Sequence, residues 1–342
     1  MGLPVVTGAA FLAAALGSLF HRRGTTRPCL SPSSRPRSWY RRSRSTPIPA
    51  SEGHLHVTIC RIRQETDLHP ELTEQIGPIA EKVAPALEEV TGLRLGHILV
   101  RIVDHEAFIE SAIEERRRVF ARDAQDFDLS IEATRALYDR LETEESELRL
   151  SWMGGPAATV TNAAYEPEVL LVPEAFHHGG HGTEVITKAL AHEFAHVAQH
   201  RASEGQVVIA YNTGRPDLRG FSDFAVGHLL HGHAEWADRQ VTRMLLGCEV
   251  ELGQPTGRET PQYLAMAKAF VERTQDPQTA PAHPAAPAEA YEEGLRWVTV
   301  IIDSLGLESF NRVWRHTRLG PTRREIKEPD VWVRRLARDI RL

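Results

Sequence analysis

The pattern that most constrains this chain is H-E-x-x-H, which occurs at His192, Glu193 and His196 in a segment typical of a helix. Residues four apart lie about one turn apart on the same helix face, so both imidazoles can reach one metal ion. Glu193 follows the first histidine directly and is expected beside that ion, where a carboxylate can accept a proton from water. Because the pattern is short and the chain has 17 histidines, the surrounding sequence has to support a site.

The composition narrows the class of protein. With 42% hydrophobic and 25% charged residues, the 342-residue chain is typical of a soluble globular protein with one large core or two domains. Its three cysteines lack C-x-x-C spacing, which argues against a disulfide framework or a thiolate zinc site and favours a reducing, cytoplasmic location. Eight arginines and no acidic residues precede Glu52. Since the whole chain has a net charge of −6, residues 52–342 have a net charge of −14. This acidity argues against nucleic acid as the main partner.

Residues 1–51 differ from the rest of the chain. The uncharged apolar segment 3–20 is barely long enough to cross a membrane and is followed by a basic, Ser- and Pro-rich extension. These arginines would keep the rest of the chain in the cytoplasm if the segment were a membrane anchor. An organellar transit peptide and an inert extension are the alternatives. Beyond it we expect an N-terminal α/β and helical part over 52–150 and a catalytic part with C-terminal helices over 151–342.

Hydrophobic periodicity predicts a predominantly helical α+β fold, with a small sheet beside the H-E-x-x-H helix. Residues 177–182, rich in His and Gly, are expected to form a flexible loop before that helix. The expected strands are 54–59, 97–103, 158–164 and 168–172, and the expected helices are 70–91, two within 108–150, 223–246 with Ser222 as its N-cap, and 291–305.

A catalytic zinc ion usually has three protein ligands and a water, so a third ligand is needed. Metzincins take it from a histidine six residues after the second one, but that position is Ala202 here. The expected source is therefore a second helix, as in gluzincins. Within 223–246 the polar side chains share one face by their spacing, whereas His233 points away from it. These polar residues are His228, His231, Glu235 and Asp238.

The segment Leu230–Asp238 resembles the L-E-G-H-A-like segment of an actinobacterial family of zinc-dependent metalloproteases, once associated with biosynthesis of a deazaflavin coenzyme. Leu190–Gln199, with L-x-H-E-x-x-H-x-x-Q, and the C-terminal segments 306–314, 321–326 and 329–335 are also similar to it. The resemblance covers roughly residues 150–342. It implies a zincin-like metallopeptidase fold, a Zn²⁺ cofactor and a cytoplasmic protein whose substrate is not established.

One position departs from the family. The glutamate before its Gly-His pair, which the resemblance implies as the third ligand, is His231 in this chain. His231 as a ligand would give a site of three imidazoles with a more acidic water. Alternatively, Glu235 binds the metal one turn further along, with His231 behind it. Loss of metal affinity is the third possibility.

The leading hypothesis is a zinc-dependent hydrolase, a metallopeptidase that cleaves peptide bonds with Glu193 as general base. A peptide or protein substrate could add to the edge of the expected strands 158–164 or 168–172. The alternative is a catalytically inactive, zincin-like metal-binding or scaffold protein, motivated by the histidine at position 231. A purely structural zinc is disfavoured because such sites are usually closed by four ligands and rich in cysteine. The sequence does not indicate the oligomeric state.

Overall fold

The computed structural model describes residues 58–251, 255–275 and 288–339. The apolar segment 3–20 and the basic extension after it lie outside these ranges, so their roles stay predictions. Among the described helices, none has both the length and the apolar character that a membrane span requires.

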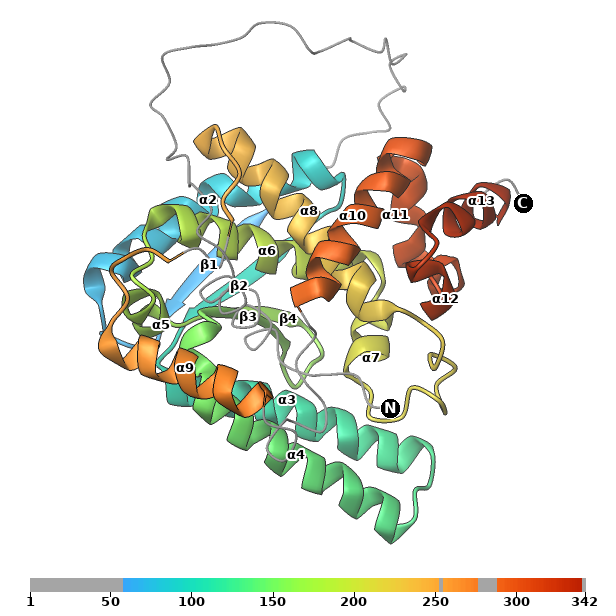
Figure 1. Cartoon of the computed structure of the whole chain (residues 1–342), viewed down its shortest axis with the longest axis horizontal. Coiled ribbons are helices and arrows are strands. Elements are labelled where there is room, and N and C mark those ends of the chain that lie inside the picture. Colours follow the sequence, from blue (N-terminus) through green and yellow to red (C-terminus); the bar gives the residue numbers. More distant parts are fainter. Residues whose placement is uncertain (1–57, 252–254, 276–287, 340–342) are drawn as a thin grey trace, which may run out of the picture.

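A four-stranded sheet lies at one side of the fold (Figure 1). The first three strands in spatial order are parallel, and the last is antiparallel to its neighbour and forms an edge. In spatial order the strands are β1 (Ile59–Gln64), β2 (His97–Ile102), β4 (Pro167–Leu171) and β3 (Ala157–Thr161). Most of the strand expected over 54–59 lies outside the described residues, and β1 begins at Ile59. Strands β1 and β2 come from the part expected over 52–150, and β3 and β4 come from the part expected over 151–342, so both parts contribute to one sheet.

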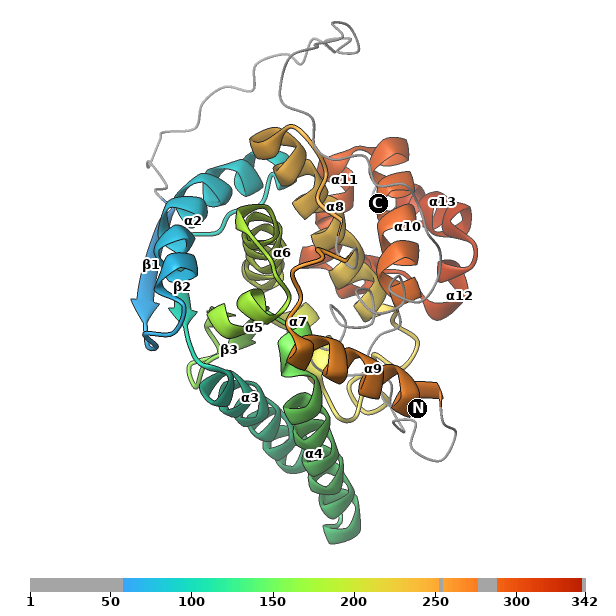
Figure 2. The same ribbon diagram turned by 60° about the vertical axis from the view of Figure 1, so that its left-hand side comes forward.

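The two faces of the sheet contact different groups of helices. Val169 and Leu171 belong to a core with helices α2 (Pro70–Thr91), α6 (Thr183–Ala202) and α8 (Val226–Leu246). Leu170, between them in sequence, points to the other face, because side chains alternate along a strand. There it joins a second core with α3 (His105–Asp126), which forms a hairpin with α4 (Ile131–Ser151) (Figure 2).

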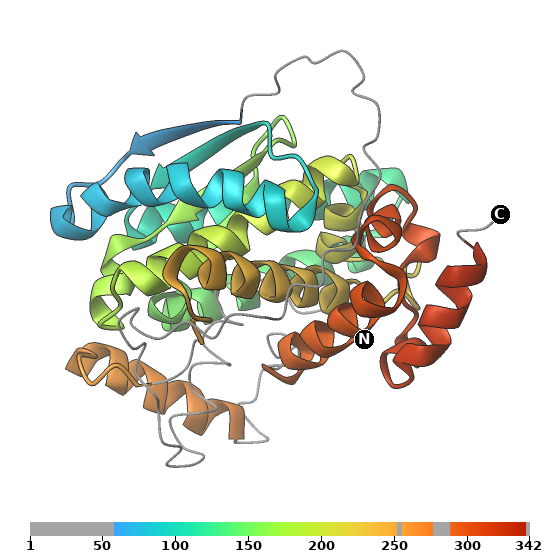
Figure 3. The same cartoon turned by 90° about the horizontal axis from the view of Figure 1, so that it is seen from above.

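The remaining elements surround these layers. Helices α10 to α13 form a group beside α8 (Figures 1 and 3), and α9 packs against α4 and η1. Their bounds are η1 Trp152–Gly154, α5 Pro173–His178, α7 Gln206–Asn212, α9 Pro261–Gln275, α10 Ala288–Leu305, α11 Leu307–Arg315, η2 Thr317–Leu319, α12 Arg323–Ile326 and α13 Pro329–Asp339.

Helix α6, which carries the H-E-x-x-H pattern, is at the centre of the molecule. Every residue from Ile186 to His200 is buried, because α2, α8, β3 and β4 surround the helix. A helix buried on all sides shows little amphipathic pattern, so its polar residues must find partners inside the protein. The buried polar residues of α6 are therefore candidates for chemistry.

Helices α8 and α10 cross with their backbones in direct contact. A Cβ built on Gly232 would lie 2.3 Å from the backbone carbon of Gly294, closer than real Cβ atoms approach such atoms. Glycine at both positions permits this crossing. Gly232 follows His231, and Gly294 lies three residues after Tyr291. The helix crossing therefore brings the rings of His231 and Tyr291 together.

The predominantly helical α+β class is confirmed, since the described residues are mostly helical with a small sheet, whereas the zincin-like fold stays a prediction. The helix over 70–91 is confirmed, beginning at a proline and ending before Gly92 in the left-handed region. Two predictions are wrong. His177 and His178 lie in α5 rather than in a flexible loop, and α8 begins at Val226 rather than beyond a Ser222 cap.

Candidate metal centre

Three histidines converge in the interior between α6 and α8. One ring nitrogen each of His192, His196 and His231 lies within 4.8 Å of the others, and all three side chains are buried. The ring centroids of His196 and His231 are 5.2 Å apart. The fold therefore brings His231 close to the two histidines of the H-E-x-x-H pattern, although His231 follows His196 by more than 30 residues in the sequence.

A glutamine fixes the orientation of His196. Nδ1 of His196 lies 2.8 Å from Oε1 of Gln199, and the amide nitrogen of Gln199 faces the Leu230 carbonyl oxygen and Nδ1 of His233 at 3.0 and 2.9 Å. Because the amide nitrogen donates to those acceptors, the amide oxygen must accept a hydrogen bond from His196. The proton of neutral His196 is thus on Nδ1, which leaves the lone pair of Nε2 available to a metal.

His192 and His231 are held in the same way from behind. Nδ1 of His192 lies 2.9 Å from Oδ2 of Asp238, and Nε2 of His231 lies 3.0 Å from the hydroxyl oxygen of Tyr211. Metal-bound histidines almost always have such a partner on the second ring nitrogen, because it fixes the ring orientation. All three histidines therefore have the outer support that a metal centre needs.

Three buried polar atoms of these residues and of Glu193 lack hydrogen-bond partners among the described residues. Nε2 of His196, Nδ1 of His231 and Oε1 of Glu193 are buried, and none makes a hydrogen bond within the described ranges. Leaving buried polar atoms without partners is costly, and a cation offsets this cost for nitrogen lone pairs and a carboxylate together. The donor set, neutral imidazoles beside a carboxylate, fits a zinc ion.

Glu193 is positioned by the edge strand of the sheet. The hydroxyl of Thr159 on β3 lies 2.7 Å from Oε2 of Glu193 and 3.0 Å from its backbone carbonyl oxygen. Burial raises the pKa of Glu193 above its ordinary value, against the opposing effects of His192 and Thr159. A buried carboxylate with a raised pKa is a stronger proton acceptor than an exposed one, as a general base requires.

Burial favours the neutral form of two of the three histidines, His196 and His231. It lowers the pKa of His196 to about 3, together with the nearby His192, and lowers that of His231 well below its ordinary value. For His192, burial is opposed by the hydrogen bond and the charge of Asp238, and the net effect raises the pKa. Neutral imidazole is the form that binds metals, so burial favours this form at two of the three positions.

Glu235, the alternative third ligand, lies on the other side of His192. Its carboxylate lies 3.1 Å from Nζ of Lys188 and 3.0 Å from Nε of Arg239. Burial raises the pKa of Glu235, but these cations together with His192 outweigh burial and lower it to about 2. Glu235 forms a second group with His192 and Asp238, without His196. The geometry thus groups His231, rather than Glu235, with both histidines of the H-E-x-x-H pattern.

A fully buried lysine links this second group together. Lys188 forms ion pairs with both Glu235 and Asp238, and neither Lys188 nor Asp238 is exposed to solvent. Burial opposes the charge of Lys188, but the two carboxylates outweigh this effect and raise its pKa. Lys188 therefore holds Asp238 in place, and Asp238 holds His192.

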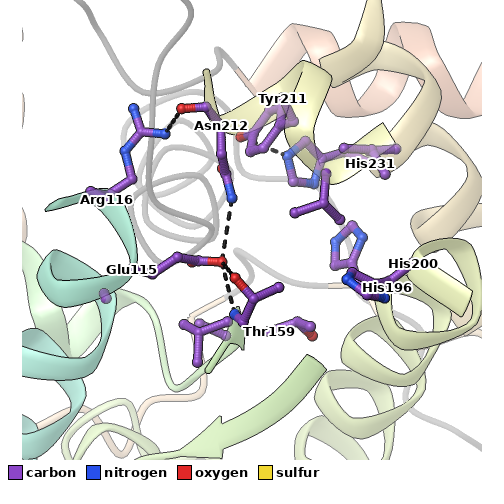
Figure 4. A pocket seen from close by; sticks show the side chains of 14 residues that line it. Glu115, Arg116, Thr159, His196, His200, Tyr211, Asn212 and His231 are labelled. Carbon is purple, nitrogen blue, oxygen red and sulfur yellow. Dashed lines mark hydrogen bonds between the residues drawn. The ribbon is translucent and has the colours of Figure 1, made fainter. Parts of the chain in front are cut away.

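A cavity of about 60 Å³ opens beside His196 and His231 (Figure 4). His196, His231 and Tyr211 form one wall, and Glu115 and Arg116 of α3 lie on the opposite side. The rest of the lining mixes apolar and polar side chains from β3, α3, α6, α7 and α8, His200 of α6 among them. The cavity gives a small group access to the space beside the histidines.

A second histidine group lies at the surface. His69, Glu71 and His177 place one potential ligand atom each within 4.8 Å of the others, and the rings of His69 and His177 stack at 4.1 Å. Glu71 and His177 are exposed. His181, from the same His- and Gly-rich segment, is instead turned inward, and burial lowers its pKa to about 4.

Several residues of the centre were not anticipated as a group from the sequence. Thr159 and Tyr211 carry no motif signal, and Lys188 reads as an ordinary helix charge. Tyr291, whose ring lies 4.4 Å from that of His231, comes from a segment read only as an apolar helix. Gln199 had a signal, since it occupies the last position of L-x-H-E-x-x-H-x-x-Q.

Comparison with known proteins supports the fold alone. No family model matches this chain, and no curated protein matches it. A solved structure from Chloroflexus aurantiacus, described as "a putative hydrolase with a novel fold", is similar with a TM-score of 0.50 and 16% sequence identity. The likeness covers 80% of this chain and 92% of that one. Membership of the actinobacterial metalloprotease family therefore stays a prediction.

Proposed function

We propose that this protein is a zinc-dependent peptidase with His192, His196 and His231 as metal ligands and Glu193 as general base. The observation that carries the proposal is the convergence of three buried histidines, two with unpartnered ring nitrogens, beside an unpartnered oxygen of Glu193. When bound, a zinc ion supplies a Lewis acid for a carbonyl group and acidifies a water. Three neutral imidazoles leave the full charge of the ion in place, which strengthens both effects.

Glu193 has the position for proton transfer. Its Oε2 is held by Thr159, which leaves Oε1 free to accept a proton from water and pass it to the leaving amine. Tyr291 can assist from the other side, because its buried hydroxyl makes no hydrogen bond with any described residue. Burial raises its pKa well above the ordinary value, so the hydroxyl keeps its proton and can donate to a developing oxyanion.

The edge strand β3 offers a binding surface for an extended peptide. The amide nitrogens of Asn162 and Val172 donate to carbonyl oxygens across the β3–β4 pair, so residues 158 and 160 face β4. The backbone groups of Ala157 and Thr159 therefore point away from β4, and of these two residues Thr159 is partly exposed whereas Ala157 is buried. A peptide paired with Thr159 would lie next to Glu193, because the Thr159 side chain is bonded to it. This arrangement favours peptide bonds over other hydrolysable bonds.

The test combines zinc content with turnover, using the purified full chain. We expect Glu193→Gln to retain zinc by elemental analysis and to cleave a mixture of quenched fluorescent peptides at least about 100-fold more slowly than the wild type. Glu184→Gln, on the same helix but at its exposed start, is the matched control and should keep full activity. A variant at Glu193 that remains active would eliminate this base from the mechanism.

The alternative of an inactive zincin-like metal-binding protein gives a different result in the same experiment. Stoichiometric zinc without cleavage of any peptide by the wild type would favour it. An intact Glu193, with its carboxylate positioned by Thr159, supports the enzyme instead.

A further inference from the structure

The cavity beside His196 and His231 is also lined by a buried carboxylate that the proposed chemistry does not use. Glu115 of α3 is 6% exposed and lines the cavity opposite His196 and His231 (Figure 4). Its neighbour Arg116, which also lines the cavity, is bonded to the Glu144 carboxylate and to the carbonyl oxygen of Asn212. Glu115 itself forms no ion pair with any residue that the structure describes.

The hydrogen bonds of Glu115 all converge on one of its two oxygens. Oε1 accepts from the backbone nitrogen of Thr161 at 2.8 Å, from its hydroxyl at 2.5 Å and from the side-chain amide of Asn212 at 3.4 Å. No described residue donates to Oε2. A buried carboxylate without an ion pair and with one open oxygen is costly unless a donor or a cation reaches it.

The same contacts limit how far a peptide can extend along β3. The outward backbone groups of Thr161 are both occupied, its nitrogen by Glu115 and its carbonyl oxygen by Arg118. An added strand can therefore pair with the partly exposed Thr159 but not with Thr161. A substrate that reaches this end of the edge meets the Glu115 carboxylate instead of further strand partners.

Resting on the proposed peptidase function, we propose that the cavity binds a protonated primary amine of the substrate through Oε2 of Glu115. The amine supplies a charged hydrogen-bond donor, whereas the donors to Glu115 among the described residues are neutral and Arg116 and Arg118 act on it through their charge alone. The nearest arginines do not compete, because Arg116 and Arg118 are bonded to other acceptors. Such an amine is either the free amino terminus of a peptide or a lysine side chain. The occupied Thr161 edge favours the amino terminus, since the chain need not continue past it.

The test measures binding rather than turnover. The probes are tetra-alanine amide with a free amino terminus and the same peptide after N-acetylation, titrated by calorimetry into the zinc-loaded Glu193→Gln protein. We expect the free-amine peptide to bind at least about tenfold more tightly, as for a hydrogen-bonded charge. In Glu193→Gln/Glu115→Gln this ratio should fall to about one, because the amide keeps the Thr161 contacts but loses the charge. Glu114→Gln in place of Glu115→Gln is the matched control and should keep the full ratio, since Glu114 lies outside the cavity and pairs with Arg117.

A third peptide, acetyl-lysyl-dialanine amide, separates the two amine sources. If it regains tight binding through Glu115, the amine is a lysine side chain; if it does not, the amine is the amino terminus. Equal binding of the free and acetylated peptides to Glu193→Gln, binding of neither at millimolar concentration, or an unchanged ratio in the Glu115→Gln variant overturns the proposal. A thermal melt of each variant controls for folding. Because no step requires cleavage, an inactive wild type would refute the peptidase and leave this result interpretable.

Discussion

Two groups of histidines in the described residues differ in their surroundings more than in their composition. His192, His196 and His231 are buried, and each has a partner on its outer ring nitrogen. The group of His69, Glu71 and His177 is largely exposed, and its nearest contacts are a ring stack and a 3.5 Å approach of His69 to Glu71. Potential ligand atoms thus lie at similar distances in both groups, but only the buried histidines have hydrogen-bond partners that fix all three rings.

The difference teaches that burial and hydrogen bonds to the outer ring nitrogens, rather than the type of ligand, distinguish a candidate metal centre from a chance grouping of histidines. Water satisfies the exposed group, so no missing partner requires an ion there. In the buried group, supporting residues fix the rings and protein atoms exclude water, which lowers the cost of organising the site on binding. The buried and the exposed group are therefore expected to differ in zinc binding.

The largest expected effect is loss of the metal. His192→Ala or His231→Ala should reduce zinc from about one ion per chain to near zero, because a site needs at least three protein ligands. His177→Ala, in the exposed group, should leave zinc unchanged. Elemental analysis of the dialysed proteins measures both. An equal loss of zinc in the variants of both groups would show that the buried and the exposed group do not differ in metal binding.

The next effect concerns the buried lysine behind the centre. Lys188→Met should destabilise the protein by about 3–5 kcal/mol, because Glu235 and Asp238 would lose their buried counter-charge. Lys268→Met, which removes an exposed ion pair with Glu272, should cost less than about 1 kcal/mol. Urea unfolding of the zinc-free proteins gives both values. A small effect at Lys188 would mean that the carboxylates are protonated in the folded protein.

A smaller effect is expected from the partner of His192. Asp238→Asn should weaken zinc binding about 10- to 100-fold, as loss of a partner behind a metal-bound histidine usually does. Glu174→Gln, which alters the 2.9 Å contact to the partly buried ring of His105, should not change the affinity. Competition with a fluorescent zinc chelator measures the affinities. Unaltered affinity in Asp238→Asn would show that Lys188 and Asp238 serve the fold alone.

The smallest effect concerns pH and the inward-turned His181. Burial lowers its pKa to about 4, so between about pH 6.5 and 4 the unfolded chain binds a proton that the folded protein does not. Stability is therefore lost as the pH falls through this window, by at most about 1.4 kcal/mol per pH unit from this residue. His181→Gln should reduce the slope by that amount, whereas His177→Gln should not. Urea unfolding at several pH values provides the slopes, and parallel curves for wild type and His181→Gln would contradict the prediction.

The predictions from the sequence succeeded where the information is local. The spacing of His192 and His196 follows from helical periodicity, and the helix over 70–91 from its apolar pattern, its first proline and Gly92. The errors have local causes too. Glycine and histidine in 177–182 suggested a loop, but α5 forms over Pro173–His178 and packs on the core through Phe176.

By itself the sequence determined a mostly helical α+β chain with a helix carrying two potential ligands and a base. It left His231 and Glu235 as alternatives, because both lie on the same face of one helix. Only the tertiary structure separated them, since the packing of α8 on α6 places His231 beside the two histidines and Glu235 beside Lys188. The Gly232–Gly294 crossing, the Thr159 contact to Glu193 and the buried Glu115 likewise depend on residues distant in sequence. The physical reason is that local periodicity fixes which face a side chain occupies, whereas long-range packing fixes what that face meets.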